Sequence, residues 1–346
     1  MQKEKLNLVV VGCSGMGRRH IKSVSQQVRA KLYGICDIDA SRVEKCAQEF
    51  HPETTTTNWR DYLTDPKVDA AVLVVPDQLH LEMTEAFLRA GKHVLCEKPM
   101  ALTADECQKM MQAEKDTGLK LMVGQVSRYA PSFKKAKEII DSGRIGELYF
   151  VESEYAHDYS ISRGANDWRV SPERHAVIGG GCHAIDLLRW IAGDPTEVYA
   201  LSNHKCLTDW PVDDCSIAVM KFPNNVNGKV LTSIGCKREY TMRSCFYGTK
   251  GTIICDNRSN YLTLFEDGEE PLGQHGKKYT IPQQIAVSIS GHNTLAEIKA
   301  FTDSILDDTD LPISSMEGAS TVAVCNAVVE SCATGMPVKV KYPVVK

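Results

Sequence analysis

The strongest constraint on the fold is the segment from Leu6 to His20, which reads LNLVVVGCSGMGRRH. Its first six residues are apolar except for Asn7, and glycines at 12, 15 and 17 follow before a stretch that can open a helix. A buried strand, a tight glycine turn and a helix start, in this order, are typical of a dinucleotide-binding unit. We therefore expect the chain to begin with a strand of a parallel sheet.

The glycine turn departs from the usual G-x-G-x-x-G pattern at one position. It reads Gly12-x-Ser14-x-x-Gly17, with an additional Gly15. Ser14 takes the place of closest approach to a pyrophosphate, where its small hydroxyl can hydrogen-bond a phosphate oxygen, and the amides at the helix start attract the same group. The residues expected to bind the dinucleotide here are Gly12, Ser14, Gly15, Met16 and Gly17.

An acidic residue follows the second predicted strand. The run 32–36 ends at Asp37, twenty residues after the last glycine of the turn. A carboxylate at this place accepts hydrogen bonds from the adenosine ribose and repels a 2'-phosphate, and Ile38 stands where a phosphate-reading arginine would otherwise be. Asp37 therefore predicts NAD rather than NADP as the cofactor. The alternatives are Asp37 as a turn residue and Asp39 or Ser41 as a helix cap.

Short apolar runs alternate with helical stretches through the first 124 residues. The runs are 32–36, 70–75, 93–96 and 119–123, and the helical stretches lie near 40–50, 79–90 and 103–117. This alternation predicts a doubly wound parallel sheet with helices on both faces.

Lys98 and Pro99 come directly after the buried run in AGKHVLCEKP, residues 90–99. Ligands of an open α/β sheet sit at the carboxyl ends of its strands, so Lys98 is a candidate for chemistry, with a surface lysine in a loop as the alternative. The segment PDQLH, residues 76–80, reaches the same edge. Further cofactor contacts are expected there from Pro76, His80, Glu97 and Lys98, although Asp77 as a helix cap and His80 as a packed residue are equally compatible with the sequence.

Composition excludes several classes of protein. The chain has 346 residues and a net charge of −4, so neither nucleic acid nor an anionic membrane surface is expected as a partner. The start resembles no signal peptide and the longest apolar runs are too short for a bilayer, which predicts a cytoplasmic protein. Thirteen cysteines without a C-x-x-C pair suggest reduced, mostly buried thiols. Cys182 and His183 are not followed by a second ligand pair, so no metal site is expected.

After residue 124 the pattern changes to β-rich runs between helices. Helices are expected over 129–142, 182–193, 293–307 and 317–334, and strands over 147–157, 196–204, 213–222, 228–237, 241–247, 251–255, 261–265 and 338–341. Runs at this spacing predict a largely antiparallel open sheet in an α+β domain. We expect domains at 1–124 and 125–346, with C-terminal segments able to pack back on the first. The irregular, polar stretch 160–181 has the length of a functional loop.

Seven segments together resemble the Gfo/Idh/MocA oxidoreductases, the family of glucose-fructose oxidoreductase and inositol dehydrogenase. They are the glycine turn 12–17, PDQLH 76–80, AGKHVLCEKP 90–99, VGQVSRYAPSFKKAK 123–137, SGRIGELYFVE 142–152, HAIDLLRW 183–190 and YGTKGT 247–252. The resemblance implies a Rossmann domain followed by a domain whose open sheet supports substrate binding and oligomerisation, in a dimer, tetramer or hexamer. It also implies that Lys98 and His183 are catalytic and that the substrate is a sugar, cyclitol or glycoside.

One position departs from the family pattern. Many of these dehydrogenases carry D-x-x-x-H, but the residue four places before His183 is Gly179. His183 therefore lacks the usual carboxylate partner and acts with another orienting group or alone. Asp186 matches a different family position, and we interpret it as mainly structural.

His183 has the pKa range of a general base for oxidising a secondary alcohol, and Lys98 supplies positive charge where alkoxide character develops. Residues predicted to line the substrate site are Arg128, Tyr129, Tyr155, His157, Asp158, Trp168, His175 and His183. Three functions are compatible with the sequence: an NAD-dependent sugar dehydrogenase, a glycosidase that uses NAD in a transient oxidation, and a non-catalytic NAD-linked sensor. Net cofactor turnover separates the first two, and its absence on a broad panel of sugars favours the third.

Overall fold

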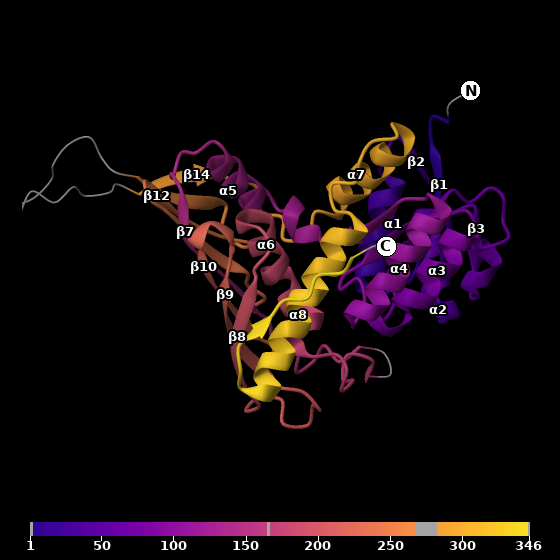
Figure 1. The fold of residues 1–346 in the computed structure, drawn as a ribbon. Helices are drawn as coiled ribbons and strands as arrows, with labels where there is room; N and C mark the ends of the chain where they lie inside the picture. The colour runs from indigo at the N-terminus through magenta and orange to yellow at the C-terminus, as the bar shows by residue number, and fades with distance from the viewer. Residues whose placement is uncertain (1–2, 165–166, 267–281, 345–346) are drawn as a thin grey trace, which may run out of the picture. The chain divides into compact units, whose positions relative to one another are not determined.

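The computed structural model describes residues 3–164, 167–266 and 282–344. The chain forms two compact units (Figure 1). Unit 1 contains residues 1–126, 293–322 and 342–346, and unit 2 contains residues 127–292 and 323–341. Each is described by itself.

Unit 1 is built on a six-stranded parallel sheet. Its strands are β1 (Leu6–Val11), β2 (Ala30–Cys36), β3 (Thr54–Thr56), β4 (Ala70–Leu73), β5 (His93–Glu97) and β6 (Leu121–Gly124). Their order, β3-β2-β1-β4-β5-β6, is that of a doubly wound dinucleotide-binding sheet. The chain first adds strands on one side of β1 and then, from β4 onward, on its other side. The predicted parallel sheet is confirmed. The sequence did not predict β3, because a short run of threonines at a sheet edge shows no apolar alternation.

Three helices of unit 1 begin at a residue whose side chain accepts hydrogen bonds from their first backbone amides. The helices of this unit are α1 (Gly15–Ser25), α2 (Ala40–Phe50), α3 (His80–Arg89), α4 (Ala104–Thr117) and α7 (Thr294–Leu306), with the first residues of α8 (Ser315–Thr334). Asp39 caps α2 by accepting from the amides of Ser41 and Arg42, as one of the alternatives expected. Thr103 and Glu106 form a capping box at α4. These caps fix where α2 and α4 start.

Unit 2 is built on a nine-stranded sheet that is antiparallel except for one pair. Its strands are β7 (Leu148–Ala156), β8 (Glu197–Asn203), β9 (Cys215–Lys221), β10 (Asn227–Ser233), β11 (Arg243–Gly248), β12 (Gly251–Asp256), β13 (Tyr261–Glu266), β14 (Gln283–Ala286) and β15 (Val338–Lys339). The order is β14-β13-β12-β11-β7-β10-β9-β8-β15, and β7 pairs with β10 in parallel. The predicted largely antiparallel sheet is confirmed, with β14 added.

The helices of unit 2 cover one side of this sheet (Figure 1). They are α5 (Pro131–Asp141), α6 (Cys182–Ala192) and the later part of α8, where Ser331 accepts a hydrogen bond from the amide of Ala200 on β8. A π-helical turn, Val177–Gly181, leads directly into α6. The stretch predicted to be irregular over 160–181 is therefore helical in its last five residues. The rest of its described part lies outside regular helices and strands.

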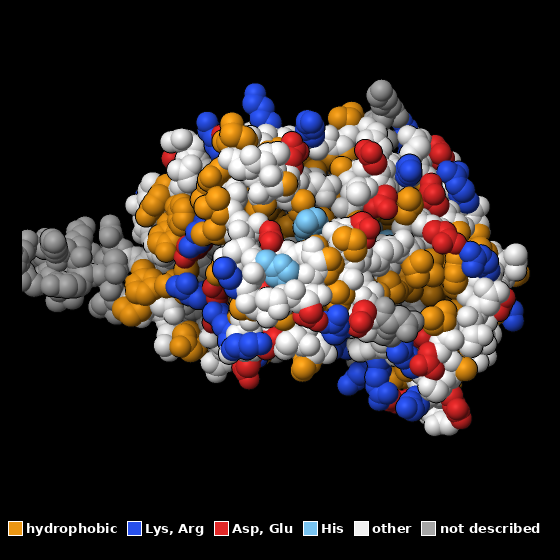
Figure 2. All heavy atoms as spheres, turned by 90° about the horizontal axis from the view of Figure 1, so that it is seen from below, with side chains coloured by type: hydrophobic (Ala, Val, Ile, Leu, Met, Phe, Trp, Pro, Cys, Tyr) orange, Lys and Arg blue, Asp and Glu red, His pale blue; other side chains and the backbone are white. Residues whose placement is uncertain are grey.

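The other side of the unit 2 sheet is exposed at β8 and β9. Burial alternates along β8 and β9, so that Tyr199, Leu201, Ile217 and Val219 are exposed while their neighbours are buried. On the molecular face in Figure 2, lysines and arginines are interspersed with acidic residues.

Within the described residues, every helix is too short or too polar to span a membrane.

Candidate functional site

The glycine turn after β1 is packed backbone against backbone. Gly12 has φ +108°, and a Cβ at this residue would lie 2.1 Å from the carbonyl oxygen of Val74. A Cβ at Gly17 would lie 1.9 Å from the carbonyl oxygen of Gly12. Only glycine fits at either position, because a carbonyl of the fold cannot move aside as a flexible side chain can.

The mouth of the same turn is open. A Cβ at Gly15 would meet no described atom within 4 Å, and Ser14 is exposed. Helix α1 begins here with no acidic residue in its first turn, and the Ser14 side chain forms no capping hydrogen bond. A helix start with open amides and without nearby carboxylates suits a pyrophosphate. The residues present therefore fit the phosphates of a dinucleotide.

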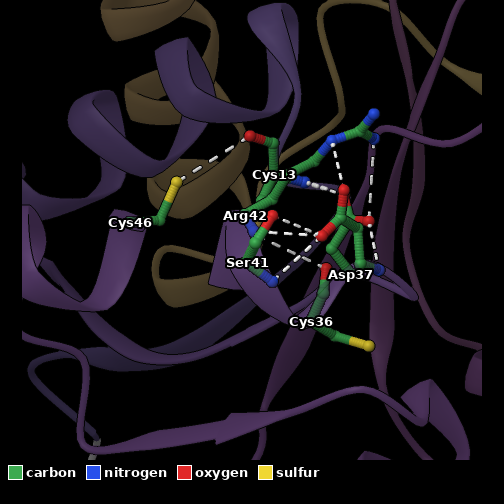
Figure 3. Close-up of polar contacts among 7 residues, drawn as sticks. Cys13, Cys36, Asp37, Ser41, Arg42 and Cys46 are labelled. Atoms are coloured by element: carbon green, nitrogen blue, oxygen red, sulfur yellow. Dashed lines mark hydrogen bonds and ion pairs between the residues drawn. The ribbon is translucent and has the colours of Figure 1, made fainter. Parts of the chain in front are cut away.

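Asp37 lies beside this turn (Figure 3). Its carboxylate accepts hydrogen bonds from the amide of Cys13 at 2.8 Å and from the amide of Asp39 at 3.0 Å. The side chain is 7% exposed, and these bonds hold it in one place. Asp37 is thus fixed to the glycine turn at the end of β2, where the sequence predicted a ribose-binding carboxylate.

Arg42 is a basic residue near Asp37 that the sequence interpretation missed. Its guanidinium lies 3.8 Å from a carboxylate oxygen of Asp37 and 3.2 Å from one of Asp39 (Figure 3). In the sequence, Ile38 occupies the position directly after Asp37 where a phosphate-binding arginine would be expected. In the structure, Arg42 in the first turn of α2 brings its guanidinium beside Asp37 instead. A cation there bears on the choice between NAD and NADP.

Lys98 is half-buried directly after β5, and its backbone is anchored by the residue before it. The Glu97 carboxylate accepts from Nε2 of His20 at 2.8 Å and from the amide of Lys98 at 3.0 Å. Burial alone raises the pKa of Glu97, but the His20 ring and the Lys98 charge lower it overall. Glu97, predicted to contact the cofactor, is therefore engaged in holding the backbone of Lys98 in place.

A third carboxyl group completes this buried cluster. The ligand atoms of His20, Glu97 and Glu297 lie within 4.8 Å of one another, and all three residues are buried. Burial and the neighbouring charge of Glu97 raise the pKa of Glu297. These residue types also bind metals, and among the described residues the buried carboxyl oxygens of Glu297 have no hydrogen-bond partner.

His80 ties two neighbouring turns of unit 1 together. Its Nδ1 lies 2.8 Å from the carbonyl oxygen of Pro99 and its Nε2 lies 3.1 Å from that of Val75. Two carbonyl acceptors require two N–H donors, so the ring is an imidazolium. Burial lowers the pKa of His80, but Cys96 and the Pro99 carbonyl outweigh it and raise the value to about 10. These hydrogen bonds support the interpretation of His80 as a packed residue. Pro76, at the start of the same segment, is half-buried.

His183 lies in the first turn of α6 and is 2% exposed. Its Nδ1 is 3.0 Å from the Oγ of Ser127, a residue that is itself 1% exposed. The ring stacks on Tyr155 at a centroid distance of 6.1 Å and lies 5.9 Å from the ring of His292. His183 therefore has a partner for one ring nitrogen and aromatic neighbours that limit its rotation.

Aromatic rings from several parts of unit 2 form a connected group that includes His183. The Tyr155 hydroxyl is 2.8 Å from that of Tyr159 and 3.2 Å from Nδ1 of His157. Tyr240 lies 5.3 Å from Tyr155, 5.0 Å from His157 and 5.6 Å from His292 between ring centroids. Burial raises the pKa of Tyr155, so its hydroxyl stays protonated. We call Tyr155, His157, Tyr159, His183, Tyr240 and His292 the aromatic cluster.

The other predicted substrate residues are placed differently. Arg128 forms a buried, bidentate ion pair with Asp186, at 2.7 and 2.8 Å, which gives both a structural role. Asp158 accepts from the amide of Ser160 and lies 3.4 Å from the Lys237 ammonium. The remaining three are partly buried: Tyr129, Trp168, which stacks on the Arg169 guanidinium, and His175, whose pKa is lowered by burial. Their roles in binding remain predictions.

The glycine run before His183 makes room for side chains. A Cβ at Gly179 would lie 2.2 Å from Nη1 of Arg174, and one at Gly180 would lie 2.4 Å from the Tyr155 ring. Arg174 is 4% exposed and donates to the carbonyl oxygen of Gly179 at 3.2 Å. The space of the absent aspartate is therefore filled by a guanidinium.

Two family models match the chain. Residues 6–125 match the oxidoreductase family with an NAD-binding Rossmann fold, and residues 133–254 match the Gfo/Idh/MocA C-terminal domain. The chain belongs to the Gfo/Idh/MocA oxidoreductase family. Its first unit is the NAD-binding Rossmann domain of this family, which confirms the cofactor class that the sequence predicted.

Similar Gfo/Idh/MocA proteins cover nearly the whole chain. Inositol 2-dehydrogenase 2 of Saccharopolyspora erythraea is 28% identical over 344 residues, with 95% of this chain and 94% of that one covered. Levoglucosan dehydrogenase of Pseudarthrobacter phenanthrenivorans is 24% identical, with 95% and 97% covered. A solved levoglucosan dehydrogenase in complex with NADH matches with a TM-score of 0.88 at 24% identity, over 98% of this chain and 100% of that one. The last comparison supports the fold.

Proposed function

We propose that this oxidoreductase is an NAD-dependent dehydrogenase that oxidises a ring hydroxyl of a sugar, glycoside or cyclitol. The observation that carries the proposal is His183, which is held through Nδ1 within the aromatic cluster of unit 2. The similar inositol and levoglucosan dehydrogenases support the class of substrate.

In the proposed reaction His183 accepts the proton of the substrate hydroxyl. A neutral imidazole is able to accept such a proton as a general base. NAD, when bound, supplies a nicotinamide ring that accepts a hydride. As the hydroxyl loses its proton, oxygen gains alkoxide character, and the ammonium of Lys98 stabilises that charge. Glu97 contributes indirectly by fixing the backbone amide of Lys98.

The aromatic cluster suits a cyclic polyol. Rings of Tyr155, Tyr240 and His292 provide apolar faces for the C–H groups of a pyranose or cyclitol, and hydroxyl and imidazole groups provide hydrogen bonds at fixed places. Trp168 and His175 complete the set of proposed contacts. As part of the same proposal we place the enzyme in the cytoplasm, because its cysteines are all unpaired and burial raises the pKa of the Cys36 thiol to about 12. We also propose that the exposed side of the unit 2 sheet is the surface through which the protein oligomerises.

The test is a substrate screen that follows NADH absorbance and product mass together. Free sugars, cyclitols and glycosides are incubated with the full chain and excess NAD. We expect NADH to accumulate in proportion to a product that is two hydrogens lighter than the substrate. A panel in which no compound changes mass would contradict an enzymatic function.

A second function is favoured by one observation, the glycine at 179. A site without the carboxylate partner of its base, and with Arg174 in that space, suits a glycosidase that oxidises the sugar, eliminates the aglycone, adds water and reduces the product again. Such an enzyme regenerates its NAD in every cycle. Release of aglycone under catalytic NAD, with no net NADH, would decide for this alternative.

A further inference from the structure

The absent carboxylate partner of His183 raises the question of what orients the ring in its place. Position 179 supplies no side chain because it is a glycine, and the guanidinium of the buried Arg174 fills the space beside it, 2.2 Å from where a Cβ would be. Asp186 is bound to Arg128 at 2.7 and 2.8 Å. The orienting group must therefore come from an element other than the helix that carries His183.

Ser127 provides this group. It lies in a 3-10 turn, Val126–Tyr129, and its Oγ is 3.0 Å from Nδ1 of His183. The same Oγ lies 3.6 Å from the Sδ of Met242, whose backbone amide donates to Oδ1 of Asn257 at 2.8 Å. Ser127 and Met242 are each 1% exposed, so the side chains of His183, Ser127 and Met242 form a buried chain of contacts.

The chemistry of these atoms selects one tautomer of His183. The contact between Ser127 and His183 fits either ring tautomer, but a thioether sulfur has no hydrogen and can only accept. The arrangement that satisfies both contacts at once therefore has the single hydroxyl proton of Ser127 directed to Met242. The serine oxygen then accepts a hydrogen bond from Nδ1–H of the neutral imidazole. With its proton on Nδ1, the ring carries its lone pair on Nε2, which is the form that a base needs to accept a proton.

We propose that Ser127 is the positioning residue of His183 and that it holds the imidazole in the Nδ1–H tautomer in place of the usual aspartate. This inference rests on the proposed function for its catalytic consequence. The tautomer itself depends only on unit 2. Because serine is neutral, it orients the ring without stabilising an imidazolium as a carboxylate does.

The first experiment is nitrogen NMR of the full chain labelled with [15N]histidine, recorded at a pH where His183 is neutral. The chain has 10 histidines, and the signals of His183 are identified by their loss in His183→Gln. We expect a protonated Nδ1 and an unprotonated Nε2 in the wild type. Ser127→Ala should give a mixture of tautomers, and Ser127→Thr, which keeps the hydroxyl, should restore the wild-type pattern.

A matched control is Ser132→Ala. Ser132 is also buried, at 3% exposure, but its hydroxyl donates to the carbonyl oxygen of Asp256. Its removal should leave the tautomer of His183 unchanged. A wild-type ring protonated on Nε2, or an unchanged ring in a folded Ser127→Ala protein, would overturn the proposal.

The second experiment uses a substrate found in the screen. Ser127→Ala should lower kcat by roughly tenfold to hundredfold, less than the 10² to 10⁴ that a general base itself contributes, with KM nearly unchanged. Ser127→Thr should recover most of the rate. A KM effect without a kcat effect would contradict a positioning role. If the screen yields no substrate, the NMR result still decides the tautomer, so the two proposals fail separately.

Discussion

The molecule has two glycine-rich turns, one in each unit, and they use glycine for opposite reasons. In the turn after β1, Gly12 and Gly17 face carbonyl oxygens of the backbone at 2.1 and 1.9 Å from where a Cβ would be. In the run before His183, Gly179, Gly180 and Gly181 face side chains, of Arg174, Tyr155 and Thr232. The first turn needs glycine so that backbones can approach. The second needs it so that side chains of neighbouring elements can pack against the helix start.

This difference separates what binds the cofactor from what surrounds the proposed base. Backbone amides at a helix start recognise phosphates whatever the rest of the substrate is. Side chains admitted beside a helix can be exchanged one by one, and here an arginine has taken the place of a carboxylate. The first turn is thus suited to the phosphates of a cofactor, and the second determines which side chains lie near His183.

The largest expected effects come from removing the proposed catalytic groups. His183→Ala and Lys98→Ala should each lower turnover by roughly two to four orders of magnitude, because a proton acceptor or the charge beside a developing alkoxide is lost. NAD affinity, measured by calorimetry, should change little. Near-normal turnover in either folded variant would remove that residue from the mechanism and would weaken the division of roles between the two turns.

Alanine substitutions in the two turns test the comparison directly. Gly12→Ala should destabilise the protein by about 3 kcal/mol or more, since both its φ of +108° and a backbone carbonyl oppose a Cβ. Gly179→Ala should cost only about 1 to 2 kcal/mol, since the Arg174 side chain can shift. Gly15→Ala, with open space around it, is the control and should be close to neutral. Denaturant unfolding measures all three, and equal losses at Gly12 and Gly179 would break the distinction.

Cofactor preference should respond to the two charges beside the first turn. Asp37→Ala should narrow the preference for NAD over NADP by roughly tenfold, because the carboxylate repels a 2'-phosphate. Arg42→Ala should widen it, since the guanidinium 3.8 Å from Asp37 offers that phosphate a partner. Calorimetric titration with both cofactors measures each change. Tighter binding of NADP than of NAD by the wild type would show that Arg42, rather than Asp37, sets the preference.

The smallest effect is a pH dependence from the buried cluster behind Lys98. The pKa of Glu297 is raised above its usual 4.5, so the folded protein keeps a proton that the unfolded chain releases above that pH. Wild-type stability should therefore fall as pH rises from about 4.5 towards the folded pKa, by at most about 1.4 kcal/mol per pH unit. Glu297→Gln binds no such proton, so its stability relative to the wild type should grow with pH. The exposed Glu4→Gln is the control, and parallel unfolding curves for wild type and Glu297→Gln would contradict the protonated state.

The fold was readable from the sequence wherever burial produced a periodic pattern. The strands of unit 1 are apolar runs because helices cover both of their faces, and β8 to β10 alternate because one side of their sheet is exposed. Helix ends followed from local caps such as Asp39. Three of the elements that escaped are β3, whose threonines carry no such pattern, the short strand β14, and the π-helical turn, whose glycines suggested a loop.

The site was predictable only in part, for a related reason. His183, Lys98, Asp37 and Tyr155 stand in or beside motifs that a single stretch of sequence displays. Tyr240 and His292 have no local signal, since each is marked only by the rings it meets from distant segments. Ser127 stands next to the predicted Arg128, but nothing in its neighbours shows that its hydroxyl meets a histidine 56 residues later.

The sequence by itself determined the alternation of strands and helices, the glycine turn with its acidic partner, and the place of Lys98 after a strand. Each of these is set by local backbone geometry and by which side chains must be buried, and such constraints repeat along neighbouring residues. The tertiary structure decided that Arg174 fills the space at Gly179, that Ser127 meets His183, and that Arg42 returns to Asp37. These contacts depend on how separate elements pack within a unit, because a side chain acquires its partner only when the fold brings distant segments together.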